Sequence, residues 1–131
     1  MEIEETLYVT NRQEYRKWLA KHYKTKKEIW LIYYIKSSRK PTIPYNDSVE
    51  EAICYGWIDG QVRNIDEGKF ARRFTPRHKE SIWSEHNKNR AIRMLEKKRM
   101  TKAGMAVLPD DIMSRWNKLK SSHKKRSKIV K

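Results

Sequence analysis

The sequence contains a single cysteine, Cys54, among its 131 residues. An internal disulfide is therefore excluded, and no cysteine or histidine spacing typical of a zinc site is present. The sequence also lacks a glycine-rich phosphate loop and a dinucleotide-binding fingerprint. We accordingly expect neither a metal nor a cofactor.

Long hydrophobic runs are absent too. No window of the sequence approaches the length of a membrane span, so we expect no transmembrane segment. The first residues do not show the basic start and apolar core of a secretory signal. A cytoplasmic protein in a reducing compartment is the expectation.

Acidic residues are few relative to basic ones. Asp and Glu total 16 against 31 Lys and Arg, which gives a formal net charge of +15 and a pI of about 10.0. Such a charge attracts nucleic acid, anionic lipid and phosphorylated metabolites without selecting among them. It is equally consistent with lysines that are merely solvated.

The length of the chain fits one domain, and five Trp and seven Tyr provide large apolar surfaces to bury. We place this domain at residues 1–119. Residues 120–131 hold six Lys or Arg, no acid and little apolar content, which predicts a disordered basic tail.

The first half of the sequence predicts helices alternating with strands. Residues 28–36 form an unbroken aromatic and β-branched run, typical of a central strand covered on both faces. Weak alternation at 5–9 predicts a short edge strand. Capping boxes at Thr10 and at Ser48 predict the starts of two helices.

The second half predicts a hairpin followed by helices. Residues 61–65 and 69–75 read as its two strands, preceded by a turn at 56–60. Ser84 is the expected N-cap of a helix reaching about residue 98, and helical segments follow at 101–108 and 110–120. The expected fold is therefore α+β: a short, mostly antiparallel sheet with packed helices and a helical C-terminal part.

Residues 52–87 concentrate the unusual residue types, with two of the five Trp and three of the four Gly. Hydroxyl groups and an arginine precede the predicted helix at Ser84, where free backbone amides favour an anion. We expect a pocket for a small anionic or phosphate-bearing ligand here. Its predicted residues are Trp57, Asp59, Arg73, Thr75, Arg77, Ser81, Trp83, Ser84 and Asn87.

Structural roles for the same residues remain open. Ser84 can serve only as a helix cap, and Asp59 can cap amides of a turn or pair with an arginine, for which Arg73 is the first choice. Asn87 falls on the apolar side of the predicted helix, and an amide there must find partners.

Catalysis has weaker support in the sequence than binding. Cys54 with His78 or His86 could form a nucleophile and base, but no third group orients them. The acidic pair at 50–51 is expected on the outer side of its helix, and the pair at 66–67 in a turn. We therefore expect a binding protein more than an enzyme.

An alternative function is nucleic-acid binding. Four aromatic residues interleave with arginines in the central segment, as in a base-stacking platform. The aromatic residues are Trp57, Phe70, Phe74 and Trp83, and the arginines are Arg72, Arg73 and Arg77. No established nucleic-acid-binding motif accompanies them.

Several short motifs of the sequence occur in a fixed order. They are Gly56-Trp57-Ile58-Asp59-Gly60, Arg73-Phe74-Thr75-Pro76-Arg77, Ser81-x-Trp83-Ser84-x-x-Asn87, Arg99-Met100 and Ala103-Gly104. Over residues 10–108 the sequence resembles the YdeI/OmpD-associated family. The resemblance implies a role in bacteriocin protection, outer-membrane porin association or resistance to cationic antimicrobial peptides, with no established reaction.

Overall fold

A four-stranded mixed sheet forms the centre of the computed structural model, which describes residues 5–129 and the side chains of residues 5–122. The strands lie in the order β1-β2-β4-β3, with β1 parallel to β2 and the other neighbours antiparallel. In chain order the elements are β1 (Thr6–Leu7), α1 (Arg12–His22), β2 (Ile29–Tyr34), η1 (Lys36–Ser38), α2 (Tyr45–Cys54), β3 (Trp57–Asn64), β4 (Lys69–Pro76), α3 (Glu85–Glu96), α4 (Lys102–Met105) and α5 (Asp110–Ile129). The α+β expectation is confirmed.

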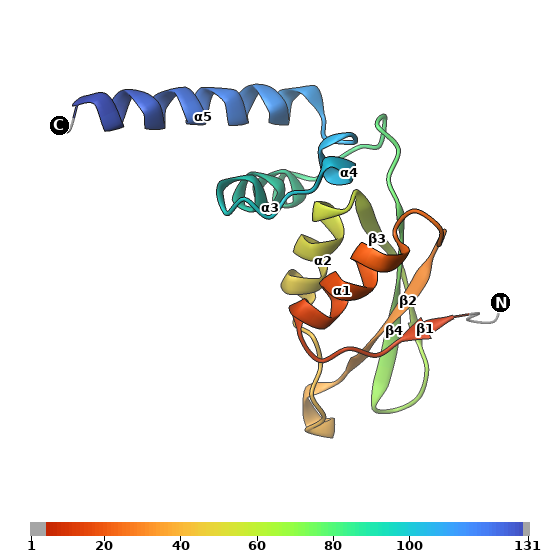
Figure 1. The fold of residues 1–131 in the computed structure, drawn as a ribbon. Helices are drawn as coiled ribbons and strands as arrows, with labels where there is room; N and C mark the ends of the chain where they lie inside the picture. Colours follow the sequence, from red (N-terminus) through yellow and green to blue (C-terminus); the bar gives the residue numbers. More distant parts are fainter. Residues whose placement is uncertain (1–4, 130–131) are drawn as a thin grey trace.

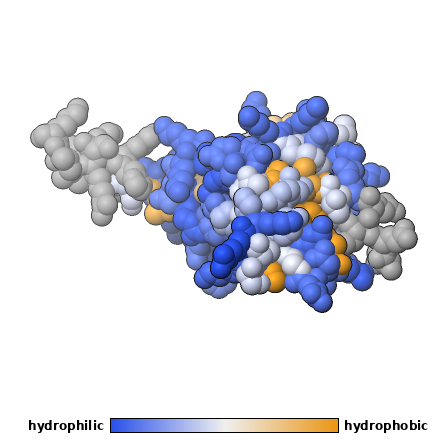
Figure 2. Space-filling view, turned by 90° about the horizontal axis from the view of Figure 1, so that it is seen from below, coloured by the Kyte–Doolittle hydropathy of each residue, from blue (hydrophilic) through white to orange (hydrophobic). Residues whose placement is uncertain are grey.

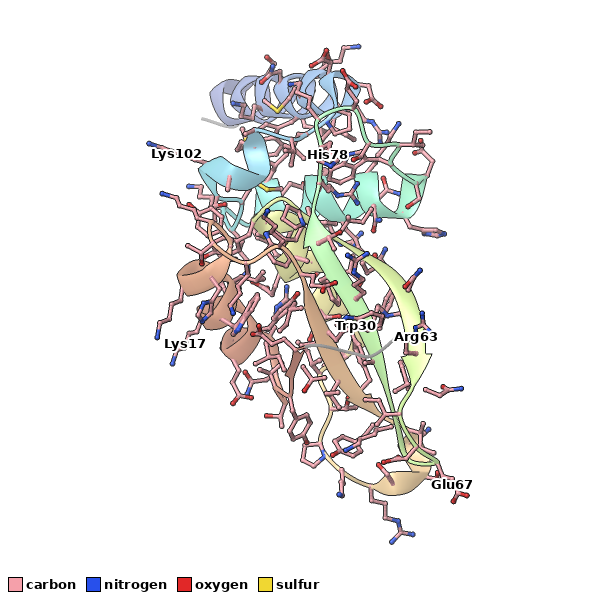
Figure 3. All side chains as sticks on the ribbon, turned by 90° about the vertical axis from the view of Figure 1, so that its right-hand side faces the viewer. Lys17, Trp30, Arg63, Glu67, His78 and Lys102 are labelled. Atoms are coloured by element: carbon pink, nitrogen blue, oxygen red, sulfur yellow. The ribbon has the colours of Figure 1, made fainter. Side chains whose placement is uncertain are left out.

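The helices are distributed unevenly around the sheet. α1 and α2 pack against one face, while α3, α4 and α5 gather at its upper end (Figure 1). Leu31 of β2, Leu19 of α1 and Ile53 of α2 belong to one buried core on the helical face. The opposite face, seen in Figure 3 with Trp30 and Arg63 labelled, carries a smaller cluster of Trp30, Ile32 and Ala71.

β2 is the inner strand that its sequence predicts. Five of its six residues are buried because successive side chains pack alternately into the two clusters. β4 pairs along its whole length, and its alternation places Phe70, Arg72 and Phe74 on the helical face, as expected. The edge strand β1 is also present.

The helix starts follow the predictions at some positions and differ at others. Ser84 caps α3 by accepting from the amide of Asn87 at 3.1 Å, as predicted. α1 is capped by Asn11 rather than Thr10, whose own amide and hydroxyl donate to Glu14. α2 starts before Ser48, at Tyr45, and the Ser48 hydroxyl donates to the Tyr45 carbonyl and contacts the Tyr33 hydroxyl instead of capping the helix.

Two predicted boundaries were wrong. Residues 57–60 belong to β3 rather than to a turn, because Trp57 pairs with Pro76 of the neighbouring strand. Within the predicted turn at 56–60, the positive φ of 75° is confined to Gly56. The tail expected to be disordered is helical to residue 129, since no Gly or Pro interrupts α5 and adding a residue to an existing helix is easy. Residues 130–131 of that prediction lie outside the described part.

The lower end of the molecule is mostly hydrophilic. Figure 2 shows this end, where small hydrophobic areas are separated by polar surface. The exposed large apolar side chains of the whole described chain include Ile35, Val62 and Ile65, each between 38% and 48% exposed. Scattered apolar residues of this kind are normal on a protein surface.

Gly104 holds α4 tightly against the end of α2. A Cβ atom added at Gly104 would lie 2.5 Å from the carbonyl oxygen of Cys54 and 2.5 Å from the sulfur of Met100. The Cys54 carbonyl also accepts a backbone hydrogen bond from Thr101 at 3.1 Å. This contact lets the segment after α3 close over the helical layer.

We therefore expect Gly104→Ala to lower the free energy of unfolding by about 1–3 kcal/mol, because the backbone of Cys54 cannot yield as a side chain can. Gly60→Ala is the matched control, since its added Cβ would meet only an ordinary contact at 3.7 Å. Urea unfolding of both variants measures the difference. Equal stabilities would contradict the close packing of α4.

Candidate functional site

The candidate site lies where β4 ends and α3 begins. The amide of Arg77, just after β4, donates to the carbonyl of Gly56 at 2.7 Å and so extends the pairing of the sheet. Residues 78–83 form a short connection to the N-cap at Ser84. His78, labelled in Figure 3, marks the start of this connection beside α3.

Arg77 is the most unusual residue of this region. Arg77 is only 5% exposed, and its guanidinium carbon lies 3.7 Å from the centroid of the Trp83 ring. None of its three side-chain nitrogens has a hydrogen-bond partner within the described part of the chain. A buried charged donor without a partner is rare, because losing hydration costs free energy that hydrogen bonds normally offset.

The charge state of Arg77 follows from its surroundings. Burial lowers the pKa of Arg77 to about 10, and the negative charge of Asp59 opposes that shift. The guanidinium therefore remains protonated at neutral pH. The indole Nε1 of Trp83 is a second buried donor without a partner among the described residues. The guanidinium of Arg77 and the indole N–H of Trp83 are thus two neighbouring buried donor groups.

The hydroxyl groups predicted for the anion site make local contacts. Ser81 Oγ accepts from the amide of His78 at 3.1 Å, and Ser84 Oγ accepts from the amide of Asn87 at 3.1 Å. These bonds use acceptor capacity only, so each hydroxyl proton is still able to donate. The capping alternative for Ser84 is confirmed, and it leaves a ligand role as a prediction.

Asp59 lies on the helical face of the sheet with Arg72, not with Arg73. Its carboxylate is 3.6 Å from the guanidinium of Arg72 and accepts from the hydroxyl of Tyr45 at 2.9 Å. The predicted pairing with Arg73 is wrong, because neighbouring residues of a strand point to opposite faces. Arg73 pairs instead with Glu28 at 2.5 Å.

Tyr45 and Arg90 extend this polar group and were not predicted from the sequence. The guanidinium carbons of Arg72 and Arg90 lie 4.4 and 5.7 Å from the centroid of the Tyr45 ring. Arg90 also donates to the amide oxygen of Asn87 at 2.9 Å. Asn87 therefore finds the partner that its position required. The two-residue period of β4 was the signal that could have identified Arg72.

Three predicted site residues lie apart from Arg77 and Trp83. Trp57 is 1% exposed and packs edge-on against Trp18 in the core. Arg73 and Thr75 lie on the sheet face turned away from α1 and α2. Arg77, Trp83, Ser84 and Asn87 are the predicted residues that the structure gathers around the start of α3.

The predicted base-stacking platform does not form as one surface. Trp57 and Phe74 are at most 1% exposed, and Phe70 stacks on Tyr33 at a centroid distance of 5.3 Å. Trp57 and Phe74 are core residues, and Tyr33 covers one face of the half-buried Phe70 ring, so these rings do not offer a shared stacking surface to nucleic-acid bases.

A second polar cluster, centred on Glu51, was missed because its helix was expected to expose this side. Glu51 is fully buried and accepts from Arg12 at 2.7 Å, from Arg16 at 2.9 Å and from Arg99 at 3.0 Å. Glu50, 3% exposed, binds Arg12 and Arg93. The prediction that this acidic pair faces outward was wrong. The cluster joins α1, α2 and the segment after α3.

Other chemical groups give little support to catalysis. Burial raises the pKa of the Cys54 thiol to about 11, so the reactive thiolate is scarce at neutral pH. Among the described residues, no three His, Cys, Asp or Glu side chains gather in a way that could hold a metal ion. Within residues 5–129, every helix is too short or too polar to cross a lipid bilayer.

Comparison with known proteins identifies a family whose function is unknown. Residues 7–107 match the family described as Domain of unknown function (DUF8412). This range includes the sheet except Thr6, together with α1 to α4 and the whole candidate site. No curated protein and no solved structure matches the chain.

Proposed function

The chain belongs to the DUF8412 family, and we propose that it binds a small anionic or phosphate-bearing ligand at Arg77 and Trp83. One observation carries the proposal: the buried guanidinium of Arg77 has no hydrogen-bond partner on any of its three nitrogens among the described residues. An anion would supply acceptors for these donors and a charge opposite to that of Arg77.

The charge around the site supports an anion rather than a cation. Arg72, Arg77 and Arg90 contribute three positive charges against the negative charge of Asp59, while Lys79 and Lys88 offset Glu80 and Glu85 at the connection and the start of α3. Asp59 is already engaged by Arg72 and Tyr45. Three minus one leaves an excess of two positive charges, and Arg77 is the buried part of that excess.

The start of α3 adds further donors to the proposed site. α3 is 12 residues long, and its N-terminal amides and dipole favour negative charge. The hydroxyl protons of Ser81 and Ser84 can donate as well. The planar fork of Arg77 suits a carboxylate or phosphate, whose oxygens accept two parallel hydrogen bonds.

Access to Arg77 requires movement of the connection at 78–83. Trp83 covers the guanidinium and is itself 7% exposed, whereas its neighbour Ile82 is 94% exposed. We propose that this connection shifts to admit the ligand and that Trp83 then closes on it. The indole donor of Trp83 would contribute to binding in the closed state.

We propose binding rather than catalysis, because the thiol of Cys54 is buried with a raised pKa. The resemblance to the YdeI/OmpD-associated family supports a physiological setting in bacteriocin or antimicrobial-peptide resistance. That setting is part of the proposal and is independent of the geometry of Arg77.

The test is thermal unfolding in the presence of phosphate, sulfate, nucleotides and sugar phosphates. We expect at least one of these anions to raise the melting temperature of the wild type, by roughly 8 °C at about 100 times its dissociation constant. Arg77→Met should remove this effect because it removes the charge and the donors.

Arg63→Met is the control, because it deletes one arginine from the opposite face of the sheet. This variant should respond to the anion as the wild type does. An equal response in all three proteins would overturn the proposed site, and so would the absence of any response in the wild type.

A further inference from the structure

Among the residues whose side chains the structure describes, the first turns of α5 anchor it to the rest of the protein. Ile112 is fully buried in the core, and Asp111 pairs with Lys88 at 2.9 Å. Arg115 lies 3.5 Å from Glu85, and Asp110 lies 3.7 Å from Lys79. These contacts fix the direction in which the remaining helix runs.

Beyond Trp116 the helix leaves the body of the protein. Figure 1 shows its C-terminal half extending past α3, with no other described element alongside it. Five of the six residues at 117–122 are exposed, and Leu119 is the half-buried exception. At 1.5 Å per residue, the 20 residues of α5 span about 30 Å. The helix is therefore an arm whose surface at residues 117–122 is free.

The arm carries charge of one sign. After Asp111 the sequence has no acidic residue and eight basic ones. They are Arg115, Lys118, Lys120, Lys124, Lys125, Arg126, Lys128 and Lys131. Lys120, Lys124 and Lys128 recur every four residues, a spacing that assigns these positions to one side of a helix. Like charges at this spacing repel each other, and a partner of opposite charge would remove that cost.

We propose that the C-terminal half of α5 binds the phosphate backbone of double-stranded DNA. A single α-helix fits the major groove of B-DNA, whereas the corresponding groove of double-stranded RNA is too narrow. Lysines provide point charges for phosphates, so the binding is expected to be independent of base sequence. This proposal does not rest on Arg77 or on the anion site.

A membrane surface fits this arm less well. Residues 117–128 contain one apolar residue, Leu119, so the helix has no apolar stripe to insert among lipid chains. Helices that lie in a membrane interface need such a stripe in addition to basic charge. Because the arm is basic and lacks an apolar stripe, it is suited to bind a hydrated polyanion.

The test compares the wild type with a triple variant, Lys120→Ala, Lys124→Ala and Lys128→Ala. Alanine favours helix, so the variant should keep its fold. The control is Lys17→Ala, Lys21→Ala and Lys24→Ala, which removes three exposed lysines at and just beyond α1. Both variants lose the same charge, from +15 to +12.

Fluorescence anisotropy with a labelled duplex, measured at several salt concentrations, provides the readout. The arm variant should lower the slope of log K against log salt concentration by about 2.7, which is 0.9 for each of the three lost phosphate contacts. Its affinity at low salt should fall at least tenfold, while the α1 control should stay within about threefold of the wild type.

Three results would overturn the proposal. One is an equal loss in both variants, which would mean that only the net charge matters. Another is stronger binding to a single-stranded oligonucleotide than to the duplex. The third is no duplex binding by the wild type, whether or not it binds vesicles that contain phosphatidylserine.

Discussion

Replacing Glu51 by glutamine is expected to lower the free energy of unfolding by about 2–3 kcal/mol, somewhat less than the roughly 3–5 kcal/mol of breaking a fully buried ion pair. Glutamine keeps the volume but removes the charge that neutralises Arg12, Arg16 and Arg99. The side chains of these arginines keep 22–34% of their exposure, so water compensates part of the loss.

Glu96→Gln is the matched control, because Glu96 is exposed on the last turn of α3. Urea unfolding at neutral pH measures both variants, and the control should stay within about 0.5 kcal/mol of the wild type. If Glu51→Gln changed the free energy of unfolding as little as the control does, the arginine cluster would not hold α1 and α2 together.

The carboxylate of Glu51 also makes the stability of the fold depend on pH in the acidic range. Hydrogen bonds from the arginines hold the pKa of Glu51 below its usual value of 4.5, although burial acts in the opposite direction. The unfolded state therefore binds the proton more readily than the folded state. Glu51 thus stabilises the fold above about pH 4.5, and this contribution is lost as the pH falls through the lowered pKa.

Replacing Arg77 by methionine is expected to raise the free energy of unfolding in anion-free buffer by about 1–2 kcal/mol. Methionine relieves the cost of burying unpaired donors, which is about 1–3 kcal/mol for a neutral group and larger for a charged one such as the guanidinium. It forfeits the contact of the guanidinium with the Trp83 ring, which is worth about 0.5–2 kcal/mol. A net gain follows because a guanidinium exposes three unpaired nitrogens to the interior.

This result separates a ligand-binding arginine from a structural one. A residue retained for binding is expected to cost stability in the absence of its ligand. Urea unfolding of Arg77→Met in buffer free of phosphate and sulfate makes the measurement. A loss of stability greater than about 1 kcal/mol would assign Arg77 to the packing of Trp83 instead.

The parts of the fold that were predicted correctly depend on local sequence. The unbroken apolar run of β2 and the N-cap at Ser84 are patterns that a few neighbouring residues specify. The same local reading failed at Trp57, where pairing with Pro76 extends β3 across the predicted turn. A partner from another strand decided the conformation there.

The polar clusters were the hardest features to predict, because their members are distant in the sequence. Glu51 meets Arg12 and Arg99, which are 39 and 48 residues away. Spacing within α2 alone could not indicate three arginines on the side of Glu51. The association of Arg77 with Trp83 could be predicted more easily, since they are six positions apart and both belong to the motifs singled out in the sequence.

The central claim is that Arg77 and Trp83 hold buried donors for an anion. NMR observation of the Arg77 Nε–H and the Trp83 Nε1–H during a phosphate titration tests it most directly. The account predicts that both signals shift together and saturate, while the indole signals of Trp30 and Trp116 stay in place. If the Arg77 and Trp83 signals remained unchanged throughout titrations with phosphate, nucleotides and sugar phosphates, the claim would be contradicted.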